Sequence, residues 1–184
     1  MTEKKSSSLK ADFCAFLRGV NVNGTTMKMI AVCELFKKSG MKNVSAVLAS
    51  GNIIFSSNKK KNELKPILEK AMSDYFKYEA FLFIKTKEEI AAIINQNPFV
   101  PLPEFHIYSF VGVDKIENML MQEFKKSIKT EHEDAKIVKE NFYWKVAKGD
   151  TLNSEFGKVL GNKKLKNSFT SRNMNTLEKV FMKM

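Results

Sequence analysis

The stretch VSAVLASGNIIFSS, residues 44–57, decides the fold, because it contains two strand-like runs joined by a very short turn. The runs VSAVLA and IIFSS are rich in β-branched and apolar residues, which is typical of buried or half-buried strands. Only Ser50, Gly51 and Asn52 separate them. So short a connection predicts an antiparallel β-hairpin.

A strand and a helix are predicted before this hairpin. The run DFCAFL at residues 12–17 is short, aromatic and followed by a glycine loop, as buried strands often are. Apolar residues then recur with the spacing of one helix face, at Met29, Val32, Cys33 and Phe36. Thr25 or Thr26 is predicted to cap this helix, and Gly40 to end it.

A second helix and a fourth strand are predicted after the hairpin. The helix presents one apolar face made of Leu64, Ile67, Leu68, Ala71, Met72, Tyr75 and Phe76. Pro66 is compatible with it only in the first turn. The run AFLFI at residues 80–84 completes the order strand, helix, strand, strand, helix, strand. This order predicts an α+β fold with a ferredoxin-like split βαβ half (βαββαβ) over residues 12–97.

The second half of the chain repeats part of this pattern. Thr86 and Glu89 form a capping box for a short helix, and the proline-rich residues 98–105 are predicted to be a linker. Over residues 106–184 we expect a second, partial ferredoxin-like half. It would contain a strand at 106–112, a helix from Asp114, a hairpin at 135–148, a short helix at 156–160 and a terminal helix.

Within the second predicted hairpin, alternating residues predict one buried strand face. Phe142, Trp144 and Val146 alternate with Tyr143 and Lys145. We therefore expect one face of this strand to be buried. At the other end of the chain, residues 1–11 are polar enough to be a flexible tail.

The chain is basic, with a formal net charge of +11 and an isoelectric point of about 9.5. Such a balance favours anionic partners such as nucleic acid, nucleotides or phosphorylated metabolites. Only Arg18 and Arg172 are arginines, and the lysines are scattered over every segment. Scattered lysines are more typical of a solvated surface than of a nucleic-acid stripe.

Several kinds of chemistry have no signature in the sequence. His106 and His132 have no cysteine near them, so no metal site is predicted. Neither the phosphate-loop motif nor the dinucleotide fingerprint occurs, and we expect no cofactor. There is no apolar span of membrane length. Cys14 and Cys33 are interpreted as reduced core residues, so we expect a soluble cytoplasmic protein without a membrane partner.

The two arginines lie in similar surroundings and form the candidate site. Arg18 follows the first predicted strand and precedes a loop containing Gly19 and Asn21. Arg172 and Asn173 directly precede the terminal helix, which Thr170, Ser171 or Asn173 could cap. The planar guanidinium fork recognises carboxylates and phosphates in a way that lysine cannot. We predict that five residues form one anion-binding pocket: Arg18, Asn21, Asn52, Arg172 and Asn173.

Three motifs, FLRGVNVNGTTMKM, ASGNIIF and TSRNMNTLEKV, resemble those of a bacterial family of unknown function, the domain-of-unknown-function family numbered sixteen ninety-seven. The family motifs read roughly R-G-I-N-V-G-G, S-G-N-V-x-F and T-x-R-N-W-x-T, in this order. The resemblance spans residues 16–180 and implies an α+β protein of ferredoxin-like character, without any implied activity. Asn23 and Met174 depart from the family pattern, which has glycine and tryptophan there.

Four functions remain open at the level of the sequence. The first is non-catalytic binding of a small phosphate- or carboxylate-bearing ligand by the candidate residues. The second is an enzyme acting on phosphoryl or nucleotide substrates, with a general acid or base among Glu34, Asp150 and Glu155. The third is a nucleic-acid binder that uses distributed lysines.

The fourth is an interaction module that pairs its strand edges with a second copy. The oligomeric state is left open. The alternative to a ligand site is that both arginines bind carbonyls or carboxylates within the fold. The acidic cluster is interpreted as a solvated loop, formed by Glu131, Glu133 and Asp134.

Overall fold

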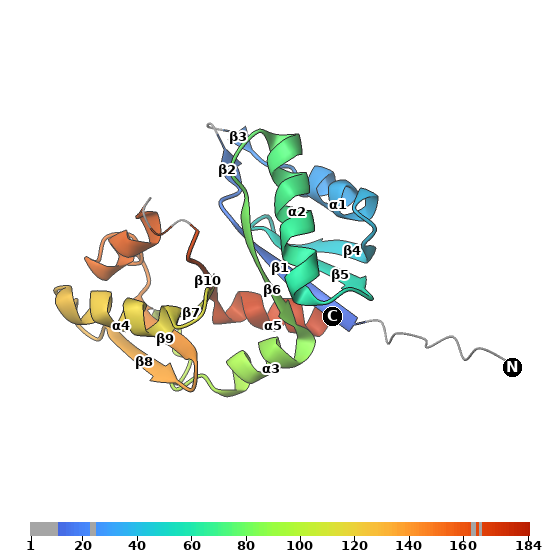
Figure 1. Ribbon diagram of the computed structural model, residues 1–184. Helices are drawn as coiled ribbons and strands as arrows, with labels where there is room; N and C mark the ends of the chain where they lie inside the picture. The colour runs from blue at the N-terminus through green and yellow to red at the C-terminus, as the bar shows by residue number, and fades with distance from the viewer. Residues whose placement is uncertain (1–10, 23–24, 163–164, 166) are drawn as a thin grey trace, which may run out of the picture.

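The protein is an α+β molecule with two four-stranded antiparallel sheets, seen in a computed structural model (Figure 1). The structure describes residues 11–22, 25–162, 165 and 167–184. Residues 1–10 of the predicted flexible tail, and Asn23 of the first motif, lie outside these described residues.

The first sheet has the strand order β4-β5-β1-β6, and every neighbouring pair is antiparallel. Its strands are β1 (Ala11–Arg18), β4 (Lys42–Val47), β5 (Asn52–Ser57) and β6 (Phe81–Thr86). The helices between them are α1 (Met29–Lys38) and α2 (Lys61–Phe76). This is the split βαβ arrangement predicted for the first half, with the predicted hairpin formed by β4 and β5.

The second sheet has the order β10-β7-β9-β8, which places its fourth strand beside its first, as in the first sheet. Its strands are β7 (Phe105–Gly112), β8 (Asp134–Val138), β9 (Asn141–Ala147) and β10 (Phe169–Asn173). The helix α4 (Ile116–Lys126) and the 3₁₀ helix η1 (Phe156–Gly161) connect them. The sequence analysis missed β10, so the second half repeats the first more fully than expected.

A helix follows the fourth strand of each sheet, and both helices lie between the two sheets (Figure 1). They are α3 (Lys87–Asn95) and α5 (Met174–Lys183), and they contact each other. The core around them takes residues from both sheets, including Phe16, Phe83, Ile107 and Tyr143. The two halves therefore share one hydrophobic layer.

Each sheet also has an outer core of its own. On the first sheet, α1 and α2 cover Phe13, Ile53 and Phe55. On the second sheet, α4 and η1 cover Phe110 and Trp144. The central strands are consequently buried on both faces, and every residue of β5 is buried.

The strand β9 corrects the prediction of a single buried face. Phe142, Trp144 and Val146 form one buried face, but Tyr143 on the opposite face is also fully buried. Its hydroxyl donates a hydrogen bond of 2.7 Å to the carbonyl oxygen of Ile93 in α3. The second face is covered because α3 and α5 pack between the sheets, which alternation within one strand does not reveal.

Two local predictions about the helices were also wrong. Thr25 and Thr26 do not cap α1 but form β3 (Thr25–Thr26), which pairs with β2 (Asn21–Val22) in a small hairpin. Pro66 lies in the second turn of α2, because the helix already begins at Lys61. Burial of the apolar face of α2, including Leu64, outweighs the one backbone hydrogen bond that proline removes.

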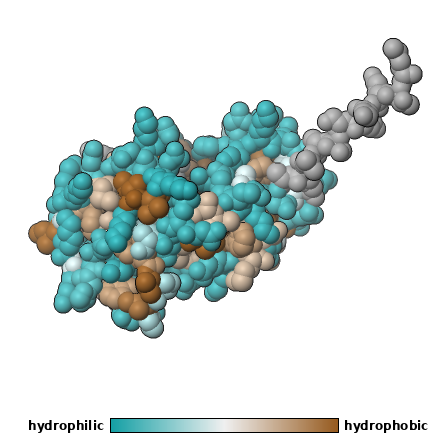
Figure 2. All heavy atoms as spheres, turned by 90° about the horizontal axis from the view of Figure 1, so that it is seen from below, coloured by the Kyte–Doolittle hydropathy of each residue, from teal (hydrophilic) through white to brown (hydrophobic). Residues whose placement is uncertain are grey.

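The predicted linker, residues 98–105, corresponds to the segment between α3 and β7, and its last residue is the first of β7. No helix in the described part of the chain is long and apolar enough to cross a membrane. The face of the molecule in Figure 2 is mainly hydrophilic, with separate hydrophobic patches among the polar side chains.

Candidate functional site

Arg172 lies in the interior and is bonded only to neutral oxygen atoms. It is the penultimate residue of β10, and 7% of its surface is exposed. Its Nε atom donates to Oδ1 of Asn52, and its Nη1 atom donates to Oγ1 of Thr170 and the Ser171 carbonyl at 2.7 and 2.8 Å. Its Nη2 atom donates to the carbonyl oxygens of Leu17, Ser50 and Gly51 at 2.9, 3.1 and 3.1 Å.

The guanidinium of Arg172 keeps its charge despite this burial. Removal from water lowers its pKa to about 10, and the positive charge of Arg18 acts in the same direction. At neutral pH the group therefore remains protonated. It also lies over the ring of Phe16, 5.3 Å from the ring centre, where a cation is attracted by the aromatic face.

Asn52 holds the other side of this contact. The residue is fully buried, and its Nδ2 atom donates to the Val47 carbonyl at 2.9 Å and to Oγ of Ser50 at 3.0 Å. Its Oδ1 atom is thereby turned toward Arg172. We call Arg172, Asn52 and the carbonyl groups of Leu17, Ser50 and Gly51 the arginine lock. It ties the end of β1 and the β4–β5 turn to β10 in the other half.

Arg18 differs from Arg172 because it is only half-buried. Its Nη2 atom donates to the carbonyl oxygen of Leu160 at 2.6 Å, and its guanidinium lies 5.3 Å from the ring centre of Phe169. Burial lowers its pKa. Among the bonds to described residues, the Nε and Nη1 atoms of Arg18 have no acceptor.

The two remaining candidate asparagines lie elsewhere. Asn21 is exposed in the β2–β3 hairpin, and its Oδ1 atom accepts a hydrogen bond of 2.7 Å from the hydroxyl of Thr26. Asn173 caps α5, since its Oδ1 atom accepts from the backbone N–H of Asn175 at 3.0 Å. Its Nδ2 atom lies 3.0 Å from Nδ1 of His106. Of the five candidates, the structure thus joins only Asn52 and Arg172.

His106 and Asn173 line a cleft of about 520 Å³, which we call the His106 cleft. Burial and the nearby charge of Lys148 lower the pKa of His106, so its ring is neutral at pH 7. The other polar residues of the cleft are Lys148, Asn175 and Glu178. Its apolar residues are Pro101, Leu102, Pro103, Phe105, Ile107 and Met174.

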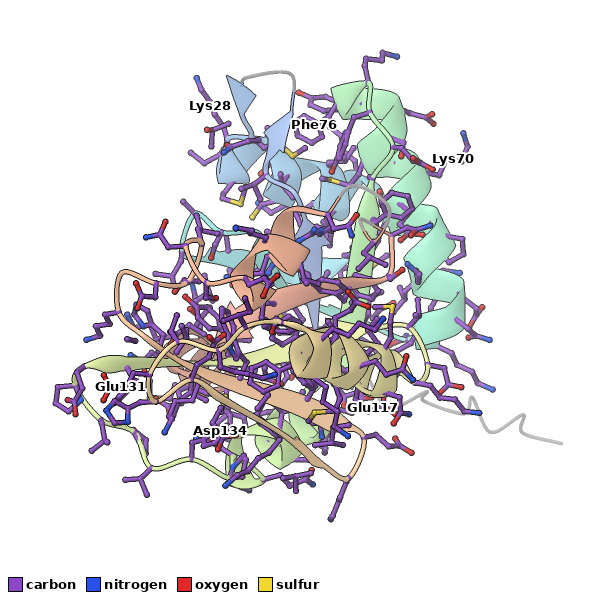
Figure 3. The ribbon with its side chains drawn as sticks, turned by 90° about the vertical axis from the view of Figure 1, so that its left-hand side faces the viewer. Lys28, Lys70, Phe76, Glu117, Glu131 and Asp134 are labelled. Carbon is purple, nitrogen blue, oxygen red and sulfur yellow. The ribbon has the colours of Figure 1, made fainter. Side chains whose placement is uncertain are left out.

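A second cleft, of about 510 Å³, lies between α3 and the start of α4. Its charged residues carry both signs and include Lys85, Glu89, Lys115, Glu117 and Lys139. Glu117 lies on the first turn of α4 (Figure 3). It is buried and accepts a hydrogen bond of 2.7 Å from Nδ2 of Asn118. A carboxylate there stabilises the amino end of the helix, so a structural role accounts for it.

The predicted acid or base candidates are dispersed. Glu34 pairs with Lys37 on the exposed face of α1, and Glu155 accepts a hydrogen bond from the backbone N–H of Ile128. Neither they nor Asp150 lines either cleft. Among the described residues, no group of three or more His, Cys, Asp or Glu side chains could hold a metal ion.

One member of the acidic cluster was misinterpreted. Glu131 is exposed, as expected of a solvated loop (Figure 3), but Glu133 is buried. Its Oε1 atom accepts a hydrogen bond of 2.9 Å from the indole N–H of Trp144, and its Oε2 atom accepts one of 2.9 Å from the backbone of Thr130. Glu133 therefore satisfies a buried tryptophan, which the charge pattern alone did not indicate.

The His106 cleft was missed by sequence analysis, which considered His106 only as a metal ligand and predicted no site there. The cleft joins the segment before β7 to the end of β10. These segments lie far apart in the chain and become neighbours only when β10 pairs with β7. Of the residues that line the cleft, sequence analysis had selected only Asn173 as a candidate site residue.

Comparison with known proteins supports the fold and the family. The structure is similar to that of the conserved bacterial protein SP0830 from Streptococcus pneumoniae, with a TM-score of 0.75 and 18% sequence identity, over 94% of this chain and 98% of the other. At this identity the likeness shows the fold. No curated protein matches the sequence. The profile of a family described as "Protein of unknown function (DUF1697)" matches residues 11–143. This range contains the first two sequence motifs, and the chain belongs to this family of proteins of unknown function.

Proposed function

We propose that the protein binds a small phosphate- or carboxylate-bearing ligand at Arg18. The observation that carries the proposal is the pair of neighbouring arginines without an acidic partner. In the described residues, neither guanidinium is hydrogen-bonded or ion-paired to a carboxylate, and the hydrogen bonds of both go to neutral oxygen atoms. Two positive charges without an anion favour the binding of one.

The two arginines have different roles in this proposal. Arg172 is buried and its donors are occupied within the arginine lock. It would therefore contribute its positive charge to the site without touching the ligand. Arg18 is half-buried, and its Nη2 atom is held by the Leu160 carbonyl. Its Nε and Nη1 atoms are then available as donors to an anion, and a held guanidinium loses less side-chain entropy on binding. Gly19 lies beside Arg18 in the chain and would contribute its backbone N–H group.

This function is binding rather than catalysis, because the acids considered above are dispersed and none is hydrogen-bonded to Arg18. The cysteines are both free, and Cys14 is buried. Free thiols are usual in a reducing compartment, which supports the cytoplasm as the site of binding.

The proposal is tested with inorganic phosphate, pyrophosphate and citrate as probes, with binding followed by calorimetry and by the NMR signal of the Arg18 Nε–H group. Arg18→Lys keeps the charge but loses the fork, so we expect affinity to fall about tenfold for at least one probe. Lys70→Gln, which removes an exposed charge on α2, is the control and should bind as the wild type does.

Equal binding by Arg18→Lys and the wild type would refute a site at Arg18. Binding of RNA that declines steeply with salt, and that Arg18→Lys leaves unchanged, would instead favour the distributed lysines. Circular dichroism of each variant establishes that the substitution leaves the fold intact.

A further inference from the structure

The His106 cleft carries opposite charges that form no ion pair with any residue that the structure describes. Lys148 follows β9, and Glu178 lies on α5, so the two charges belong to different elements of the cleft. Neither takes part in an ion pair between described residues, with each other or with any other group. A single ligand that carries both a negative and a positive group would satisfy both.

The donors of the cleft cluster near Lys148. Because the Nδ1 atom of neutral His106 lies 3.0 Å from the amide of Asn173, it accepts the hydrogen bond, and the ring proton resides on Nε2. Lys148 is close enough for its charge to lower the pKa of His106. The Nε2–H group and the Lys148 ammonium together suit a carboxylate.

The rest of the cleft is apolar. Leu102, Phe105 and Met174 line it together with two prolines, and Met174 is buried while Leu102 is partly exposed. Glu178 lies four residues after Met174 on α5, so the two side chains share a helix face. A volume of about 520 Å³ is within the range of small-molecule sites.

We propose that the His106 cleft binds a zwitterionic ligand with an apolar body, a free amino acid or a short peptide. Its carboxylate would contact Lys148 and His106, its ammonium group would contact Glu178, and its apolar part would lie against Leu102 and Met174. This site uses none of the donors of Arg18 and is independent of the anion site proposed above.

The test removes one charge from the ligand and the matching charge from the protein. Leucine and leucyl-leucine are titrated calorimetrically into the full-length protein, together with their N-acetylated and C-amidated derivatives. In the wild type, either modification should weaken binding about tenfold, the usual effect of losing one charged hydrogen bond.

In each protein variant, one of the two ligand modifications should no longer weaken binding. In Glu178→Gln we expect acetylation to have no further effect, because the partner of the ammonium group is already absent. In Lys148→Gln the same should hold for amidation. Glycyl-glycine should bind more weakly than leucyl-leucine to all variants, because it has no apolar side chain. A preference for leucine or for leucyl-leucine distinguishes the two ligand sizes.

Asp74→Asn, which removes an exposed charge of α2 in the first half, is the matched control, and Arg18→Lys should leave this binding unchanged. The proposal is overturned if neither parent ligand binds at millimolar concentration. It is equally overturned if blocked and free ligands bind alike, or if both cleft variants behave as the wild type does. Failure of phosphate binding at Arg18 would leave these results unaffected.

Discussion

At the scale of single residues, the arginine lock resolves what the sequence left open for Arg172. Its donors all bond within the protein, to acceptors from β1, the β4–β5 turn and β10. Burying such a charged residue costs free energy of desolvation. Replacing it destabilises the fold further, because the buried acceptors around it lose their donors. The structure therefore favours a structural role for Arg172 and leaves Arg18 as the residue available to a ligand.

Replacing Arg172 tests this role. Arg172→Lys keeps a positive charge but loses most of the fork, so buried carbonyl groups in the arginine lock are left without donors. We expect the free energy of unfolding to fall by about 3 kcal/mol or more, measured by urea denaturation. Arg18→Lys, which replaces a half-buried residue, should cost less. A loss below about 0.5 kcal/mol for Arg172→Lys would contradict the lock.

The two cysteines should differ in reactivity. Burial raises the pKa of Cys14 to about 12, and it also raises the pKa of Cys33, but Cys33 is only partly buried and is therefore accessible to a reagent. The reactive form is the thiolate, so at pH 8 we expect a thiol reagent to label one cysteine of the native protein, Cys33. Both should react in guanidinium chloride, and labelling of Cys14 in the native state, identified by peptide mass, would disprove this expectation.

At the scale of elements, the β4–β5 hairpin is fixed by one glycine in a tight place. Gly51 has φ of 74°, and a Cβ atom there would lie 2.7 Å from Cγ1 of Val20 and 2.9 Å from Cβ of Leu17. Its carbonyl also accepts from Arg172 and from the backbone N–H of Leu17. The turn thus needs both the backbone freedom of glycine and its small size.

Comparing Gly51→Ala with Gly40→Ala separates the need for a positive φ from the need for a small residue. Gly40 has φ of 88°, but a Cβ atom there would meet nothing within 4 Å. We expect Gly40→Ala to cost about 1 to 2 kcal/mol from the backbone alone, and Gly51→Ala to cost about 1 to 3 kcal/mol more from overpacking. Equal losses in urea unfolding would show that the close approach to Val20 and Leu17 has no energetic weight.

At the scale of the whole molecule, two similar halves form one structure through a shared middle layer. Helices α3 and α5 each follow the last strand of their half and pack against each other. The core around them draws on both sheets, and the arginine lock crosses the same boundary. We therefore propose that residues 98–105 separate two halves of the chain that do not fold as independent domains, and that both halves fold cooperatively.

This cooperativity predicts a single unfolding transition. Trp144 is the one tryptophan and lies in the core of the second half, so its fluorescence reports that half, while far-ultraviolet circular dichroism reports both. We expect the two midpoints in urea to coincide, and Arg172→Lys to shift them together. A tryptophan transition separated from the dichroism transition would mean that the halves unfold independently.

The sequence determined what depends on neighbouring residues. Apolar periodicity located the main helices, short apolar runs located strands on either side of Gly51, and their order predicted the ferredoxin-like arrangement of the first half. Elements without such a pattern were not predicted. The main example is β10, whose five residues include the charged Arg172. That strand is defined by its pairing with β7, and pairing between distant segments has no local signature.

Only the tertiary structure decided which polar residues are buried and what they contact. Arg172 and Asn52 are interior because β10 comes beside β7 and against the end of β1. Tyr143 is buried because helices from both halves cover a face that alternation alone marks as open. Burial of a polar group depends on whether distant partners can satisfy its hydrogen bonds. The sequence shows which residues can donate hydrogen bonds, but only the tertiary structure determines which acceptors they reach.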